Sequence, residues 1–196
     1  SLSTFNEAAA QLNDSTDFDI DAEAIPVTRY TTEAAWATAL LEFDVVVIGE
    51  NGGATSDYNG KPLFAALRDF VDAGGGVVST GWFAGEIAAY SSAQLIADAD
   101  YISPVAASQF SFFTGTGTSI TVLDPSLPSA GGIAGYTVNA LLHELAEDVD
   151  PGAIELASGS NGRPAIAYDE VGQGLTVYLG SLHMAGSAYW IDRTPG

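Results

Sequence analysis

Two short apolar runs constrain the fold of this chain more than any other feature of its sequence. The run Phe43–Gly49 reads FDVVVIG, and the run Gly76–Thr80 reads GVVST. Both are apolar on both faces of a strand, which is typical of the centre of a parallel sheet. A helix pattern lies between them, and strands that alternate with helices join into one parallel sheet through right-handed crossovers. We therefore predict Val45–Ile48 and Val77–Ser79 as adjacent central parallel strands of an α/β domain.

Local signals predict the helices around these strands. Polar caps, a proline in a first turn and a glycine after a last turn are the usual marks of helix ends. The marks are the capping-box pair Thr4 and Glu7, the cap Thr31 or Thr32 of a helix over 33–42, and Pro62 and Gly74 at the two ends of a third helix. After the second strand, a tight turn over 81–85 leads into a further helix.

The segment Asp17–Val27 alternates apolar residues with acidic ones. A period of two residues predicts a strand with one buried face. The row of carboxylates on the other face suits an edge strand, because charge blocks pairing with another chain.

The later part of the chain has a looser pattern. It predicts short strands over 101–105 and 119–123, a helix over 136–147 with His143 on its outward face, and strands over 153–158, 164–168 and 175–179. The last two flank the turn Gly172-Gln173-Gly174, which predicts an antiparallel hairpin.

Composition bounds the class of protein. The length of 196 residues predicts a single domain over 1–196, and the apolar runs are too short to insert into a membrane. Twenty-five acidic residues against five basic ones give a net charge of −20, which repels nucleic acid. The charge fits either an ordinary solvated acidic surface or a protein adapted to salty or calcium-rich surroundings.

The chain contains no cysteine, which excludes disulfides, thiolate metal sites and thiol nucleophiles. It begins with Ser1 and with a helix, whereas a doubly wound domain normally begins with a strand. These observations predict a module excised from a longer polypeptide, whose partners are the neighbouring domains. With the charge, they predict an extracellular or cell-surface bacterial protein, as in an adhesin.

Four stretches resemble the class I glutamine amidotransferase-like superfamily, and most of all its ThuA-like branch, the trehalose-utilisation type. They are FDVVVIGENGG, FVDAGGGVVSTGWFAG, SITVLDPSLPSAGGIAG and RPAIAYDEVGQGLTVYLGSLH. The resemblance extends over about residues 31–190. It implies a flavodoxin-like three-layer sandwich with a mostly parallel central sheet of strand order 2-1-3-4-5. In that order the strand at Asp17–Val27 lies at the edge.

The resemblance also implies that the family's amidotransferase chemistry is lost. The catalytic Cys of the family lies on the strand-to-helix turn that here is Gly81–Gly85, where Trp82 and Phe83 stand instead. The family's His-x-Glu pair corresponds to His183 and Ala185, so the acid that should orient the His is missing. Neither nucleophile nor orienting acid remains.

The same fold places ligands in a crevice at the carboxyl ends of the strands. The residues expected there are Glu50, Asn51, Gly52, Thr80, Gly81, Trp82 and His183. As a non-catalytic module, the chain would bind a small molecule or glycan, with Trp82 as a flat stacking surface. Trp82 as a core residue is an alternative. A hydrolase acting on a sugar-related substrate is the other functional candidate, with Glu50 and His183 as its acid/base pair.

Asp17, Asp19 and Asp21 resemble the alternating acids of a calcium loop, so Ca²⁺ is the metal to consider. The match is incomplete, because the turn glycine and the twelfth-position Glu are missing. An edge strand explains the same residues without a metal.

Overall fold

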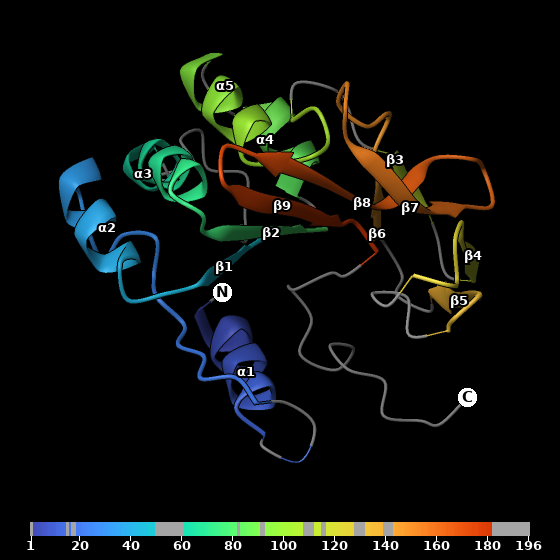
Figure 1. Cartoon of the computed structure of the whole chain (residues 1–196), viewed down its shortest axis with the longest axis horizontal. Helices are drawn as coiled ribbons and strands as arrows, with labels where there is room; N and C mark the ends of the chain where they lie inside the picture. Colours follow the sequence, from blue (N-terminus) through green and yellow to red (C-terminus); the bar gives the residue numbers. More distant parts are fainter. Residues whose placement is uncertain are drawn as a thin grey trace.

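The computed structural model places most of the chain (Figure 1). It describes residues 2–14, 16, 19–49, 61–81, 83–90, 93–107, 112–114, 117–127, 132–138 and 143–181. The following account of the structure concerns these residues.

Helices lie mainly in the first half of the chain and strands in the second (Figure 1). The helices are α1 (Leu2–Leu12), α2 (Glu33–Leu40), α3 (Lys61–Asp72), α4 (Phe83–Tyr90) and α5 (Ala93–Tyr101). The strands are β1 (Val45–Ile48), β2 (Gly76–Thr80), β3 (Phe112–Thr114), β4 (Thr118–Val122), β5 (Gly135–Val138), β6 (His143–Leu145), β7 (Ile154–Gly159), β8 (Pro164–Val171) and β9 (Gly174–Leu179). None of the helices in the described part of the chain is long and apolar enough to cross a membrane.

The main sheet is mixed and has the order β1-β2-β9-β8-β7-β4-β5. Only β1 with β2 and β2 with β9 pair in parallel, whereas the other neighbours pair antiparallel. The prediction of an α/β fold is confirmed, and the prediction of a mostly parallel sheet is wrong. The difference arises in the second half of the chain. The connections from β7 to β8 and from β8 to β9 are too short for the crossover that parallel neighbours need, so these pairs are antiparallel.

The two apolar runs pair as predicted, but one of them is not central. Val45 lies opposite Gly76 and Ile48 opposite Ser79, so β1 and β2 are parallel neighbours. However, β1 is the last strand of the sheet. Val45 is accordingly 52% exposed. The apolar residues of the run predict two covered faces, but they do not specify how many strands pair with it. The run therefore has the sequence of a central strand although it lies at the edge of the described sheet.

The predicted edge strand at Asp17–Val27 is wrong within the described part. Residues 19–27 belong to no strand, and Asp17 lies outside the described residues. The segment keeps the predicted alternation over 21–24, where Asp21 and Glu23 are exposed and Ala22 and Ala24 half-buried, but Ile20 is exposed like Asp19 before it. What it lacks is a paired neighbour.

Three further sequence predictions fail. Within 136–147, the described residues 136–138 and 143–147 contain the end of β5 and the whole of β6 and no helix, so His143 lies on a strand. Helix α5 extends to Tyr101, and the predicted strand over 101–105 retains only an isolated bridge from Val105 to Val149. Helix α1 begins at Leu2, so Thr4 is inside the helix and does not cap it.

Other local predictions are confirmed. The hydroxyl of Thr32 accepts a hydrogen bond from the Ala35 N–H at 3.3 Å and caps α2. The chain turns between β8 and β9 at Gly172, whose φ of +60° lies in the left-handed region that glycine adopts readily. Helices α3, α4 and α5 lie on one side of the sheet and α1 on the other (Figure 1). Phe64, Leu67 and Phe83 are among the largest buried side chains of the core that joins α3, α4 and α5 to the sheet.

Candidate functional site

Two of the predicted crevice residues lie in the described part of the chain. Thr80 and Gly81 come at the carboxyl end of β2, directly before α4, and both are buried. The hydroxyl of Thr80 donates to the carbonyl oxygen of Ile48 at 3.3 Å, so it connects β2 to β1. The other predicted ligand residues, Glu50, Asn51, Gly52, Trp82 and His183, lie outside the described residues, and their roles stay predictions.

The centre of this region is a residue that the sequence analysis missed. Glu144, on β6, is fully buried although it is acidic. Its Oε2 accepts a hydrogen bond from the Gly85 N–H at 2.9 Å, and its Oε1 accepts one from the Ala84 N–H at 3.3 Å. The Tyr178 hydroxyl donates to Oε1 at 2.8 Å.

These contacts place a carboxylate at the N-terminus of α4. Ala84 and Gly85 are the second and third residues of that helix, so their N–H groups have no partner inside it. The helix dipole adds positive potential at the same point, which favours an anion. Glu144 therefore occupies, from within the chain, the position where a helix N-terminus would otherwise bind an anion from solution.

Tyr178 is the third partner and is fully buried. Burial raises the pKa of its hydroxyl well above 10, and the adjacent Glu144 carboxylate raises that pKa further. The hydroxyl is thus held in its protonated form, in which it donates to the carboxylate.

A close backbone approach brings Glu144 to this position. The Glu144 N–H donates to the Gly180 carbonyl at 3.1 Å, and the Gly180 N–H donates to the Ala165 carbonyl at 3.0 Å. A Cβ atom at residue 180 would lie 2.6 Å from the Glu144 carbonyl oxygen and against the Tyr178 hydroxyl. Only glycine fits between them without displacing one of these groups.

The arrangement restricts the chemistry of the turn before α4. In acyl-transfer enzymes, backbone N–H groups near such a turn stabilise the oxyanion of the transition state. Here the Ala84 and Gly85 N–H groups already donate to a carboxylate. An incoming oxyanion would have to displace a buried, hydrogen-bonded charge.

The predicted calcium ligands do not form a metal site in the described structure. Asp19 and Asp21 are exposed, and Asp17 lies outside the described residues. Among the residues that the structure describes, no three His, Asp or Glu side chains are grouped closely enough to hold a metal ion. Calcium binding stays a prediction.

Comparison with known proteins identifies the fold. No protein-family model and no curated protein matches the sequence. Among solved structures, a ThuA-like protein from Bacteroides uniformis ATCC 8492 is similar, at 15% identity and a TM-score of 0.63, over 98% of this chain and 80% of that one. The chain has a ThuA-like fold.

Two cytoplasmic proteins of Salmonella typhimurium share this ThuA-like fold. The one from strain LT2 is 16% identical with a TM-score of 0.63, over 97% of this chain and 78% of its own. The other is 16% identical with a TM-score of 0.56, over 90% of this chain and 73% of its own. At these identities the likeness concerns the fold.

The comparison corrects the predicted setting. Because both Salmonella proteins are described as cytoplasmic, the prediction of an extracellular or cell-surface protein is wrong. That prediction depended on the start of the chain, and also on the charge of −20 and the missing cysteines. Neither of the last two features specifies a compartment, because acidic and cysteine-free proteins fold equally well in reducing and oxidising surroundings.

Proposed function

We propose that this ThuA-like domain is a non-catalytic binding module. Its ligand, a small molecule or a glycan, would lie in the crevice at the carboxyl ends of β1 and β2. The observation that carries the proposal is Glu144, which takes up the N–H groups of Ala84 and Gly85 with its own carboxylate. With no thiol in the chain, the turn lacks the nucleophile of a Cys-dependent acyl-transfer site, and two backbone N–H groups at the start of α4 already have an acceptor.

The proposed ligand class follows from the residues of the turn. Trp82 lies between Gly81 and α4, and an indole ring offers the flat apolar face on which sugar rings stack. Glu50 and Asn51, which follow β1 in the sequence, supply carboxylate and amide groups for sugar hydroxyls. The charge of −20 disfavours anionic ligands and favours neutral ones such as glycans.

Thermal shift with a panel of neutral mono- and disaccharides tests this proposal. A sugar at ten times its Kd stabilises the folded state by about 1.4 kcal/mol, which raises the Tm by roughly 3–6 °C for a chain of this size. The Trp82→Ala variant should lose the shift and Trp82→Phe should keep most of it, because a phenyl ring still stacks. Release of ammonia from glutamine, or cleavage of a chromogenic glycoside, would refute a non-catalytic module. If no sugar shifts the Tm, the glycan part of the proposal fails.

A further inference from the structure

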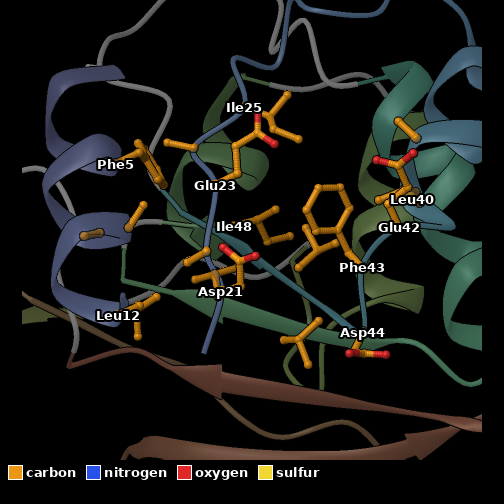
Figure 2. Close-up of a pocket in the computed structure, with 18 of the residues that line it drawn as sticks. Phe5, Leu12, Asp21, Glu23, Ile25, Leu40, Glu42, Phe43, Asp44 and Ile48 are labelled. Carbon is orange, nitrogen blue, oxygen red and sulfur yellow. The ribbon is translucent and has the colours of Figure 1, made fainter. Parts of the chain in front are cut away.

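A groove of about 680 Å³ runs along the outer edge of β1, which has no partner in the described sheet, and reaches the carboxyl end of the strand at Ile48 and Gly49. Helix α1 and the segment 19–28 form one wall (Figure 2). The other wall is formed by β1 and the residues before it, together with residues of α2 and with Leu63 of α3. Phe5 and Leu12 come from α1, and Phe43 and Ile48 from the β1 side (Figure 2).

The lining residues show that the groove faces the edge of β1 and not one of its faces. All four residues of the strand, Val45 to Ile48, line it. Successive side chains of a strand point to opposite faces, so a groove above one face would contact only alternate residues. In the described sheet, β1 pairs with β2 alone. The outer backbone groups of β1 therefore border the groove.

The opposite wall is an extended segment that is held in place without a strand partner. The side-chain amide of Asn13 donates to the Ala22 carbonyl at 2.8 Å, and its Oδ1 accepts from the Ala22 N–H at 2.6 Å. This is the pair of hydrogen bonds that a neighbouring strand residue would supply. The segment thus resembles a sheet strand separated from β1 by the groove.

The size of the groove matches one short strand. A strand residue extends about 3.3 Å along the strand, about 4.8 Å across the sheet and about 10 Å through it, or roughly 160 Å³. A volume of about 680 Å³ therefore holds roughly four strand residues. This equals the length of β1, which has four residues.

The groove is lined by apolar side chains and by carboxylates. Most of the lining is apolar, and Ile20 and Val45 remain 50% and 52% exposed at the groove. Five carboxylates also line it, and no Lys, Arg or His is among the described residues that do so. These acids are Asp19, Asp21, Glu23, Glu42 and Asp44. An apolar interior with an acidic rim complements an apolar segment with basic flanks.

We propose that this groove binds an extended segment of a separate polypeptide, which adds to the sheet as a strand beside β1. The segment has about four apolar, β-branched residues that fill the groove and Lys or Arg residues on either side that face the acidic rim. Main-chain hydrogen bonds to β1 supply affinity, and the flanking charges supply specificity. A second copy of this chain is the wrong occupant, because it would bring together two chains of charge −20. The groove adjoins the proposed crevice at the carboxyl end of β1, but the inference uses none of the residues proposed for that crevice and does not depend on it.

The test uses a fluorescein-labelled peptide of sequence KKVIVVKK and measures its binding by fluorescence anisotropy. Controls are a peptide with proline in place of the central isoleucine and a peptide with glutamate flanks, EEVIVVEE. We expect KKVIVVKK to bind at micromolar concentration, at least tenfold more tightly than either control. Proline removes a backbone donor and the strand geometry, and glutamate is repelled by the rim. Hydrogen exchange should show added protection of the β1 amides when KKVIVVKK is bound.

Charge reversal on the protein distinguishes peptide binding in the groove from nonspecific attraction of the peptide to the acidic surface. The double variant Asp21→Lys/Glu23→Lys should weaken KKVIVVKK about tenfold or more and allow EEVIVVEE to bind. The matched control Asp69→Lys/Glu170→Lys makes the same change of charge at exposed residues away from the groove and should change the affinity less than twofold. Equal effects of the two double variants, or no binding of KKVIVVKK at 100 µM, would overturn the proposal. The proposal would also be overturned if the chain alone formed a dimer and Val45→Lys dissociated it, because a second copy of the chain would then occupy the groove.

Discussion

Replacement of Glu144 is the most direct test of how this fold is stabilised around α4. Glu144→Ala leaves the Ala84 N–H, the Gly85 N–H and the Tyr178 hydroxyl without their acceptor. Each buried donor without a partner costs about 1–3 kcal/mol. The variant also removes a desolvated charge, which returns part of that cost. Three such donors together cost about 3–9 kcal/mol, and because part of this is returned we expect a net loss of about 4 kcal/mol in the free energy of unfolding.

Two milder variants divide this cost among its parts. Glu144→Gln keeps the shape and one acceptor oxygen but turns an amide toward a donor, so it should cost about 1–2 kcal/mol. Tyr178→Phe removes one of the donors to a buried carboxylate and should cost about 1–2 kcal/mol. In the double variant Glu144→Ala/Tyr178→Phe the hydroxyl is no longer left without an acceptor, so the loss should fall about 1–2 kcal/mol short of the sum.

Urea unfolding followed by circular dichroism measures these differences, provided that the m-value stays constant. Glu170→Ala, at an exposed residue of β8, is the control and should change stability by less than about 0.5 kcal/mol. A loss below about 1 kcal/mol for Glu144→Ala would contradict the argument from unsatisfied donors. Strict additivity of the two single variants would show that the carboxylate and the Tyr178 hydroxyl do not interact.

Four further predictions follow from the structure. Burial, with a smaller contribution from neighbouring carboxylates, raises the pKa of Asp150 to about 6. The folded state therefore gains stability as the pH falls from 7 to 4. Asp150→Asn should stabilise the protein by about 1–2 kcal/mol at pH 7, allowing for partial solvent screening, and by almost nothing at pH 4 in urea titrations. Gly180→Ala should cost about 1–3 kcal/mol in the same assay, because its methyl group contacts the Tyr178 hydroxyl. Because the pKa of Tyr178 is raised well above 10, stability should fall as the pH rises past 10, and Tyr178→Phe should flatten that fall. The Tm should rise with NaCl, which screens the charge of −20; a larger rise in millimolar Ca²⁺ at matched ionic strength would indicate a calcium site, and an equal rise would exclude one.

Elements that local chemistry encodes could be predicted from the sequence. The cap at Thr32 and the hairpin at Gly172 follow from neighbouring residues, and the pairing of β1 with β2 follows from the helix pattern between two apolar runs. A cap needs one oxygen near one N–H, and a tight hairpin needs one residue that tolerates a positive φ. The residues that meet these requirements lie within a few positions of the cap or turn, so they can be recognised in the sequence.

The helix predicted over 136–147 failed for the opposite reason. Its apolar residues recur at helical spacing, but short apolar runs fit a buried strand equally well. The decisive contact of this region joins Glu144 to Ala84 and Gly85, about 60 positions earlier in the chain. The only local sign was an acidic residue inside the largely apolar run LLHELA. An acid in such a run needs a partner, and the sequence does not name the partner.

The segment Asp17–Val27 shows what a period of two residues does and does not encode. The pattern assigned the acids to an exposed face and the apolar residues to a sheltered one. Residues 21–24 have this arrangement, whereas Ile20 is exposed. The pattern did not supply a hydrogen-bonding neighbour, because alternation determines the faces of an extended segment and leaves its edges open. The same holds for β1, whose apolar faces led to its prediction as a central strand. The segment Asp17–Val27 has the pattern of an edge strand, and β1 has the pattern of a central strand. A groove with the volume of one short strand lies between them. If an added strand fills this groove, β1 becomes central and both patterns are explained. Both failed predictions therefore have one physical explanation, and the peptide experiment tests it.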